Sequence, residues 1–380
     1  MHIVIAPDSF KESLTAFQAA RAIEKGILAV DQATTITKVP MADGGEGTVQ
    51  SLVDATGGTL KQLTVQGPRQ APVEAFYGLS GDGKIAVIEM AAASGIDKLT
   101  VAERNPEETT TYGVGELIRD ALETGVEEIL LGIGGSATND GGAGMVVALG
   151  GQLLNKAGEC IAPTGGGLSE LATIDLSQLH PRIKDVTFNV ACDVDNPLTG
   201  PQGASAIYGP QKGATAQQIE RLDQNLVHYA RLVKEVTGKD VDKVPGAGAA
   251  GGLGAGLLAF LGAELKRGGD LMVELLDLET KIKQADLVIT GEGGINHQTI
   301  YGKTPIAVSK VAQKYHKPVI VLSGCINSGF ESVYDHGVNA VFSVIPELTT
   351  LEEALQRGSE NLTRTARNVM AVIQCLQLKK

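Results

Sequence analysis

The chain opens with His2-Ile3-Val4-Ile5-Ala6-Pro7-Asp8-Ser9-Phe10-Lys11, a short apolar run that ends abruptly in polar residues. Consecutive apolar residues rich in β-branched types predict a buried strand over 3–6. Asp8 to Lys11 then follow the end of that strand, and ligands of open parallel sheets bind outside the carboxyl ends of the strands. An apolar strand followed by a polar or glycine-rich loop is therefore the pattern from which we assemble the fold.

The same pattern recurs along the chain. Buried strands are predicted for the apolar runs 34–39, 85–88, 129–132, 188–191, 287–289, 319–322 and 341–344. Helical patterns with clear end signals lie between many of them. Thr15 precedes one that stops at Gly26, and a capping box of Thr215 and Gln218 opens another that closes at Gly238. A capping box of Thr350 and Glu353 precedes the last helix.

This alternation of strands and helices predicts an α/β architecture with a largely parallel sheet. The length of 380 residues favours two or three domains over one. The formal charge of −12 disfavours binding to nucleic acid or to an anionic membrane. We therefore expect small-molecule ligands, and any anion among them must be bound by local donors.

Cysteines and the first residues indicate the compartment. The four cysteines, Cys160, Cys192, Cys325 and Cys375, are widely spaced and form no CxxC pair, which is typical of reduced thiols. The first residues carry no basic region and too short an apolar run for a signal peptide. The uncharged segment 244–263 consists largely of glycine and alanine, which makes it a poor candidate for a membrane span. We expect a cytoplasmic protein that does not enter the membrane.

Three stretches imitate nucleotide-binding signatures. Residues 246–251 satisfy GxGxxG but follow a poor strand, so a phosphate-binding turn at a helix start is preferred to a dinucleotide site, with simple close packing as the alternative. Residues 78–84 have the spacing of a phosphate loop but precede a strand, which predicts a hairpin turn. Gly302-Lys303-Thr304 lacks the first glycine of that loop, and Pro305 is placed to start a helix, although Lys303 could touch an anion.

Acidic residues and lysines at the strand ends carry the chemistry. Asp193 and Asp195, two residues apart on an extended segment, point the same way and could share a magnesium ion, or they could simply form the turn before Pro197. Lys11 and Lys212 are the candidate cations, each with an ordinary solvated lysine as its alternative. The histidines show no spacing typical of zinc ligands or of a serine triad.

Taken as a set, these loops resemble those of the bacterial glycerate kinase family from one end of the chain to the other. The residues that carry the resemblance are 6–14 (APDSFKESL), 40–48 (PMADGGEGT), 132–144 (GIGGSATNDGGAG), 192–198 (CDVDNPL), 209–214 (GPQKGA) and the glycine tract 246–256. The resemblance implies an ATP- and Mg²⁺-dependent kinase that converts D-glycerate to phosphoglycerate, with the 2-phospho isomer favoured, in organic-acid catabolism leading to glycolysis.

The resemblance also implies two interleaved α/β domains. Residues 1–72 and 285–380 would form a flavodoxin-like, Rossmann-like domain, and residues 73–284 an inserted domain resembling restriction endonucleases in topology. The site would lie in the cleft between the two domains.

Roles follow from residue chemistry together with this resemblance. Asp193 and Asp195 are assigned to magnesium or to activation of the substrate hydroxyl, with Glu292 assisting and Lys11 neutralising phosphate oxygens. Substrate binding is assigned to Asp8, Ser9, Asp43, Gly44, Glu46 and Lys212. ATP binding is assigned to Gly134, Gly135, Ser136, Asn139, Asp140, Gly248 and Gly251.

The chain departs from the family pattern at one loop. The family usually has Gly-Glu-Gly-Arg-Ile-Asp where this chain has Gly291-Glu292-Gly293-Gly294-Ile295-Asn296, so an arginine and an aspartate are both replaced. An arginine clamps anions and an aspartate can serve as base or metal ligand, so we expect reduced turnover. The bland alternative is a structural ion pair whose joint loss is nearly neutral.

Two rival functions remain open at this point. A catalytically weakened paralogue that only binds glycerate or nucleotide is supported by the altered loop, and a nicotinamide-dependent dehydrogenase rests on the GxGxxG stretch alone. The phosphorylated hydroxyl, the loop that holds ATP and any self-association to a homo-oligomer are also left open.

Overall fold

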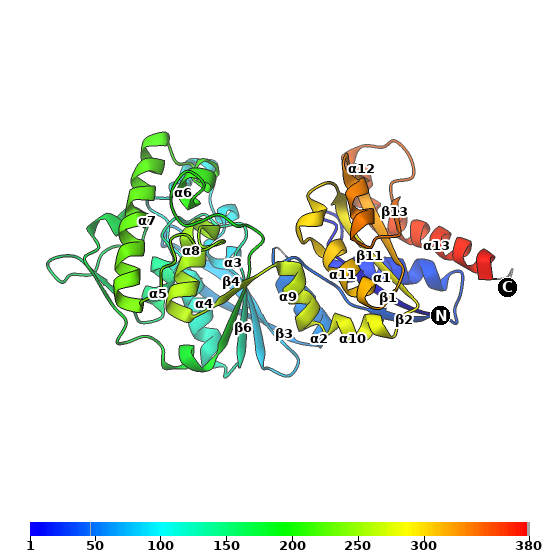
Figure 1. The fold of residues 1–380 in the computed structure, drawn as a ribbon, viewed down its shortest axis with the longest axis horizontal. Helices are drawn as coiled ribbons and strands as arrows, with labels where there is room; N and C mark the ends of the chain where they lie inside the picture. Colours follow the sequence, from blue (N-terminus) through cyan, green and yellow to red (C-terminus); the bar gives the residue numbers. More distant parts are fainter. Residues whose placement is uncertain (46, 378–380) are drawn as a thin grey trace. The chain divides into compact units, whose positions relative to one another are not determined.

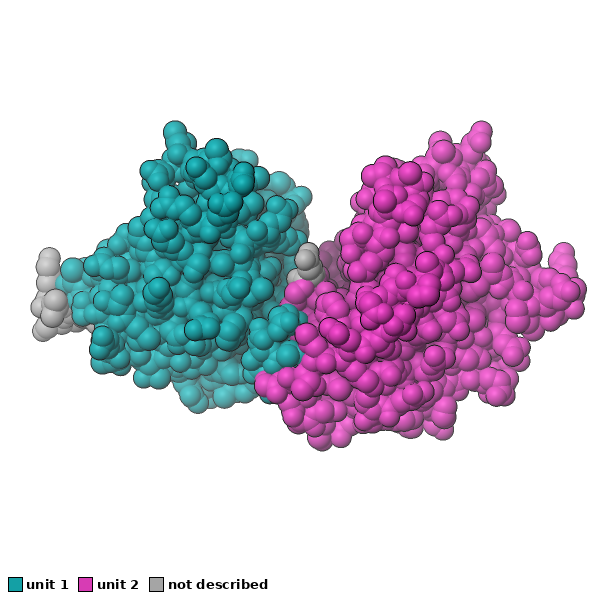
Figure 2. All heavy atoms as spheres, turned by 180° about the vertical axis from the view of Figure 1, so that it is seen from behind, with its two compact units in different colours: residues 1–43, 50–56, 267–380 teal, residues 44–49, 57–266 magenta. Residues whose placement is uncertain are grey.

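The computed structural model describes residues 1–45 and 47–377. The chain divides into two compact units, coloured separately in Figure 2. Unit 1 comprises Met1–Asp43, Gln50–Thr56 and Arg267–Lys380, and unit 2 comprises Gly44–Val49 and Gly57–Lys266. The chain thus passes from unit 2 back to unit 1 at residue 267, whereas the family resemblance implied a change at residue 285.

Unit 1 is built on a five-stranded parallel sheet in the order β13-β12-β11-β1-β2. Its strands are β1 (His2–Pro7), β2 (Thr35–Lys38), β11 (Leu287–Ile295), β12 (Val319–Ile326) and β13 (Ala340–Ser343). All five had been predicted from apolar runs. Strands β1 and β11 pair in register from Ile3 opposite Leu287 to Pro7 opposite Gly291, so their carboxyl ends lie side by side.

Helices cover both faces of this sheet. Ile3 and Ile5 of β1 pack with α1 (Ala16–Leu28) and α13 (Gly358–Gln377), whereas Val4 and Ala6 pack with the helices of the other face. Those helices are α9 (Gly268–Leu275), α10 (Leu278–Lys283) and α11 (Thr304–Lys314). The strand is apolar on both sides because both sides are covered. Unit 1 therefore joins the two ends of the chain in one core (Figure 1).

Two helix ends differ from the sequence prediction. Helix α1 does not stop at Gly26 but continues to Leu28. Gly26 is instead a crossing point, because a Cβ there would lie 2.3 Å from the backbone oxygen of Thr363 in α13. The capping box of Thr350 and Glu353 is present, but it opens the short α12 (Leu351–Gln356), and the last helix begins separately at residue 358.

Unit 2 contains a six-stranded sheet in the order β10-β9-β6-β5-β4-β3. Its strands are β3 (Thr59–Gln66), β4 (Pro72–Leu79), β5 (Ile85–Glu89), β6 (Glu128–Gly132), β9 (Thr187–Ala191) and β10 (Glu264–Lys266). Strands β5, β6, β9 and β10 are parallel, and β3 and β4 are antiparallel additions that the sequence analysis did not predict. A separate two-stranded sheet pairs β7 (Gln152–Leu154) with β8 (Thr173–Asp175).

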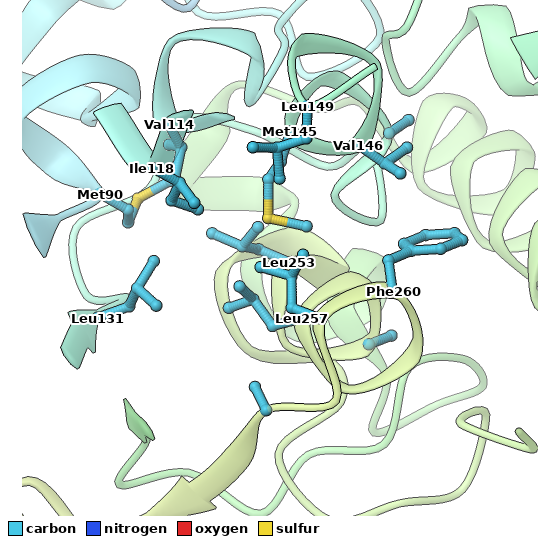
Figure 3. Packing of buried hydrophobic residues seen from close by; sticks show 14 of the residues in the cluster. Met90, Val114, Ile118, Leu131, Met145, Val146, Leu149, Leu253, Leu257 and Phe260 are labelled. Atoms are coloured by element: carbon cyan, nitrogen blue, oxygen red, sulfur yellow. The ribbon is translucent and has the colours of Figure 1, made fainter. Parts of the chain in front are cut away.

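The helices of unit 2 pack around one hydrophobic core. They are α3 (Ala91–Ser94), α4 (Tyr112–Glu123), α5 (Ala143–Ala148), α6 (Ala204–Tyr208), α7 (Ala216–Thr237) and α8 (Ala249–Gly256). Most of α2 (Thr48–Thr56) belongs to unit 1, which includes Gln50–Thr56. Figure 3 shows Met145 of α5 directed toward Leu253 of α8, with Val114 and Ile118 of α4 nearby. This packing holds the loop between β6 and α5 against α8.

Several local predictions for this unit are confirmed. Residues 80–84 form the turn between β4 and β5, as predicted for the false phosphate loop. Helix α7 opens with the capping box of Thr215 and Gln218 and ends at Gly238, which has a φ of 72°. None of the helices in the described part of the chain combines the length and the apolar character needed to span a bilayer.

Candidate functional site

The first candidate site lies at the strand ends of unit 1. In the order β13-β12-β11-β1-β2, the chain builds the sheet outward in one direction from β1 and in the other from β11. Such a switch point leaves a ligand-binding crevice at the carboxyl ends of the two strands. Asp8 directly follows β1 and Glu292 lies in the last part of β11, and the Asp8 amide donates to the Gly291 oxygen at 2.8 Å.

Asp8 is held by two donors. Its Oδ1 accepts from the Ser9 amide and its Oδ2 accepts from Thr304 Oγ1, each at 2.6 Å. Loss of hydration and the neighbouring Asp43 carboxylate raise the pKa of Asp8 from 3.8 to about 7, against the opposing effect of these two hydrogen bonds. The carboxyl group of Asp8 can therefore exchange a proton near neutral pH.

Glu292 is buried, with 7% of its surface exposed. Its Oε1 accepts from Thr299 Oγ1 at 3.0 Å, and its Oε2 accepts from Lys303 Nζ at 3.1 Å. Desolvation raises the pKa of Glu292, while Lys303 and Thr299 oppose that rise. The Lys303–Glu292 pair thus places one cation and one anion beside the Asp8 carboxyl group, which senses the charge of Glu292.

The other predicted residues of this site lie around Asp8. Ser9 is half-buried, and Lys11 is exposed on the same loop. The backbone of Phe10 and Lys11 passes Gly293, where a Cβ would lie 3.5 Å from the Lys11 amide nitrogen. Asp43 contributes charge at Asp8, and Glu46 lies outside the described residues.

The second candidate site is the loop of unit 2 that joins β6 to α5. Gly134 and Gly135 are exposed, whereas 136–140 are buried. Two backbone hydrogen bonds join this loop to residues 94–96. The Ile96 amide donates to the Gly135 oxygen, and the Ala137 amide donates to the Ser94 oxygen. Within the described part of the chain, the Gly134 and Gly135 amides donate to no protein acceptor. They remain available to an anion.

Asp140 anchors the buried end of the loop rather than facing a ligand. Its carboxylate accepts from the Thr111 amide and hydroxyl, each at 2.8 Å, and from the amides of Gly142 and Gly144, each at 3.1 Å. Desolvation raises the pKa of Asp140 against these four donors. Asn139 is likewise buried and donates to Ser205 Oγ. Both residues therefore shape the loop from inside.

Lys212 also lies inside unit 2, with only 2% of its surface exposed. Its Nζ donates to Ser136 Oγ at 2.7 Å and to the Thr138 oxygen at 2.6 Å. Desolvation lowers the pKa of Lys212 from 10.5 to about 7, although Asp140 opposes that shift. Lys212 thus contacts the glycine loop itself.

The glycine tract 246–256 packs against the same loop. Ala250, Gly251 and Gly252 all have positive φ, so the start of α8 is not a regular helix. A Cβ at Gly251 would lie 1.9 Å from the Thr138 oxygen, and one at Gly248 would lie 2.1 Å from the Pro197 oxygen. Both glycines are buried, so close packing accounts for them.

Asp193 and Asp195 follow β9 and are both exposed. Desolvation raises the pKa of the Cys192 thiol, and the charges of Asp193 and Asp195 raise it further. Among the described residues, no three acidic, histidine or cysteine side chains form a ready-made metal cluster.

Gly44 is buried in unit 2 beside Gly132, the last residue of β6.

Sequence reasoning missed several residues of these sites. Thr304 and Thr299 were not singled out, although the Gly302-Lys303-Thr304 motif had been noted for a contact with an anion. Thr111 and Tyr229 were missed as well. Tyr229 is buried, its ring limits the space at Gly141, and its hydroxyl has no partner among the described residues. Thr304 and Thr111 bond Asp8 and Asp140 across 296 and 29 positions of chain, so only the tertiary structure identifies them, whereas Thr299 lies just seven residues from Glu292.

Known proteins resemble this chain over its whole length. The sequence pattern of the glycerate kinase family matches residues 3–374. A "Glycerate kinase" of Halalkalibacterium halodurans is 56% identical over 370 residues, covering 97% of each chain. A "Glycerate 2-kinase" of Escherichia coli is 52% identical over 373 residues, covering 98% of each chain. A solved structure of a Salmonella typhimurium protein assigned as glycerate kinase 2 superposes with a TM-score of 0.93 at 53% identity, covering 100% of this chain and 99% of the other.

Proposed function

Because this chain belongs to the glycerate kinase family, we propose that it transfers the γ-phosphoryl group of ATP to a hydroxyl group of D-glycerate. The family implies a kinase that uses ATP and a small-molecule acceptor. The relative named glycerate 2-kinase supports 2-phosphoglycerate as the product over 3-phosphoglycerate. The product would enter glycolysis, in keeping with cytoplasmic organic-acid catabolism.

One observation carries this proposal, the placement of Asp8 at the switch point of the unit 1 sheet. A group that accepts the proton of a substrate hydroxyl works best when its pKa lies near the working pH. The pKa of Asp8 is raised to about 7, and Thr304 and Ser9 hold its carboxyl group in one orientation. Asp8 is therefore proposed to accept the hydroxyl proton of glycerate.

The Lys303–Glu292 pair supplies the neighbouring charges. Lys303 is partly exposed, whereas Glu292 is buried, so the ammonium group can also meet the carboxylate of a hydroxy acid. Glu292 keeps Lys303 in place and adds negative charge near Asp8, which favours the protonated form of Asp8 after transfer. Ser9, Lys11 and Asp43 are proposed to line the same glycerate site.

ATP is proposed to bind at the glycine loop of unit 2. The exposed Gly134 and Gly135 amides are suited to phosphate oxygens, because a loop without side chains lets the backbone approach an anion closely. Ser136, Asn139 and Asp140 hold that loop from its buried side. Gly248 and Gly251 support the loop by packing.

Magnesium is proposed to be held by Asp193 and Asp195. The ion usually takes one or two protein carboxylates together with substrate phosphates and water, and these two exposed carboxylates fit that requirement. When bound, Mg²⁺ neutralises charge on the transferred phosphoryl group. Both carboxylates follow β9, the parallel neighbour of β6, so they leave the sheet at the same edge as the glycine loop.

The finer description of the fold is also part of the proposal. Unit 1 has the strand order 2-1-3-4-5 when its strands are renumbered, which supports the flavodoxin-like assignment. The likeness of the inserted domain to restriction endonucleases remains a proposal from family resemblance.

The experiment that tests the function is an assay of the purified protein with ATP, Mg²⁺ and D-glycerate, with the two phosphoglycerate isomers separated. We expect ATP-dependent formation of 2-phosphoglycerate. Accumulation of 3-phosphoglycerate would show that the other hydroxyl group of glycerate is phosphorylated. Absence of any phosphoglycerate would refute the proposal in favour of a protein that only binds its ligands. Asp193→Asn should abolish turnover without loss of the folded state.

A further inference from the structure

A buried lysine supports the glycine loop of unit 2 from behind. Lys212 ends the short 3₁₀ helix Pro210–Lys212, and its side chain is among the largest fully buried side chains in the described part of the protein. Lysine is almost never buried to this degree without paired charge, because the ammonium group loses its hydration. A burial of this kind requires a compensating interaction.

The compensation comes from the loop. Lys212 Nζ donates to Ser136 Oγ and to the Thr138 oxygen, at 2.7 and 2.6 Å. These two acceptors lie on the buried side of the same turn whose exposed side carries the Gly134 and Gly135 amides. The Lys212 side chain therefore holds the turn just after Gly134 and Gly135, the residues proposed to bind phosphate.

We propose that Lys212 is a positioning residue for the phosphate loop, which fixes the loop through Ser136 and Thr138 and takes up a proton when the phosphates of a nucleotide bind on the loop's exposed side. This inference rests on the proposed binding of ATP to unit 2. It replaces the earlier assignment of Lys212 as a residue that touches glycerate.

The surrounding charges make proton uptake possible. Desolvation lowers the pKa of Lys212 to about 7, and Asp140 is the acidic group that acts against this shift. Tyr229, the next titratable group, is itself buried beside Asp140, and burial raises its pKa, so it stays neutral. The Arg104 guanidinium lies on the side of the 3₁₀ helix, where it donates to the Gln211 oxygen. An anion at the loop adds negative charge near Lys212 and favours its ammonium form.

Linkage determines the sign of the effect. A group with a pKa of about 7 is roughly nine-tenths deprotonated at pH 8. If ATP raises that pKa, the complex holds more protons than the free protein, so ATP affinity falls as pH rises above 7. Phosphate groups have second pKa values of about 6, so ATP contributes little proton exchange of its own at pH 8.

The test is calorimetric titration of the protein with ATP and Mg²⁺ at pH 8, without glycerate, in buffers of different ionisation enthalpy. The wild-type protein should take up roughly half a proton or more per ATP bound. Lys212→Met should lose this uptake and the dependence of ATP affinity on pH, and its kcat/KM for ATP should fall by about 10²-fold. Lys239→Met is the matched control, since the exposed Lys239 donates to the Leu258 oxygen elsewhere in unit 2.

The outcomes separate the two claims. If the wild-type protein binds ATP without taking up a proton, the inference is wrong even though ATP binding stands, and this result needs no variant to fold. The inference also fails if the folded Lys212→Met protein takes up the same fraction of a proton as the wild type. If the wild-type protein does not bind ATP at all, the proposed function fails and this inference fails with it.

Discussion

Thr304, the first residue of α11, donates a hydrogen bond of 2.6 Å to the carboxyl group of Asp8, which lies 296 positions earlier in the chain. The bond joins the loop after the first strand to a helix of the last third of the protein. A donor at a helix start would ordinarily keep an aspartate ionised. Here desolvation and the charge of Asp43 outweigh it, so the pKa of Asp8 rises to about 7.

The raised pKa of Asp8 should make the folded protein less stable as pH rises. Folding raises its pKa from 3.8 to about 7, so the folded protein holds more protons between these pH values and loses stability across that window. Asp8→Asn removes the effect. We expect the variant to gain about 2 kcal/mol relative to the wild type between pH 4 and pH 8, a discounted value because Asp8 is partly exposed.

Urea unfolding at several pH values measures this gain. Asp31→Asn is the control in the same unit, because hydrogen bonds from Thr34 and the Ala33 amide lower the pKa of Asp31, and its replacement should give no such gain at high pH. A difference between Asp8→Asn and wild type that stays constant with pH would contradict the raised pKa.

Lys303→Met should destabilise unit 1 by leaving Glu292 buried without its cation. The loss is expected to be about 1 to 2 kcal/mol near pH 8, since Thr299 still donates to the carboxylate. It should shrink at lower pH, where Glu292 becomes protonated more readily because the pKa of Glu292 rises further without Lys303. Chemical unfolding of Lys314→Met gives the comparison, since the exposed Lys314–Glu279 pair, which joins α11 to α10, should matter little. Equal losses in the two variants would contradict the prediction.

Gly251→Ala should distort the glycine loop. A Cβ at this position would meet the Thr138 oxygen at 1.9 Å, and the residue has a φ of 68°. We expect a loss of about 2 to 5 kcal/mol in stability, from overpacking and left-handed strain together, and a higher KM for ATP. Gly238 also has a positive φ, of 72°, but a Cβ there would have nothing within 4 Å. Gly238→Ala therefore measures the backbone strain without the overpacking. If the two variants lose the same stability, the contact with Thr138 contributes nothing.

Gly294→Arg combined with Asn296→Asp should raise turnover. A Cβ at Gly294 meets only Asn327 Nδ2 at 3.7 Å and Cys325 Cβ at 4.0 Å, so the first carbon of a side chain fits there without a clash. Asn296 accepts from the Gln298 amide at 2.8 Å, a bond that an aspartate keeps. Restoring a good transition-state donor should increase kcat by about 10². Steady-state kinetics of the double variant and of Asn296→Asp alone test this, and an unchanged kcat would leave the two positions with a structural role only.

Much of the fold was predictable because its parts are local. The buried strands of the unit 1 sheet are continuous apolar runs. Each end of α7 is marked by residues next to it in the chain, the Thr215–Gln218 capping box at its start and Gly238 at its end. Strands β3 and β4 were missed because their polar residues alternate and their stability comes from pairing with each other along their whole length. Gly26 was misjudged because a helix-ending glycine and a helix-crossing glycine look alike until the other helix is known.

The sequence by itself determined which residue types follow each strand, and therefore that carboxylates, glycines and lysines gather at one edge of each sheet. That much depends on chain neighbours and on the direction of parallel strands. Only the tertiary structure decided that Lys212 is buried behind the glycine loop and that Thr304 holds Asp8. Burial and hydrogen-bond partners depend on which distant segments pack together, and they set the pKa of each group, so the same residue types acquire different roles in the fold.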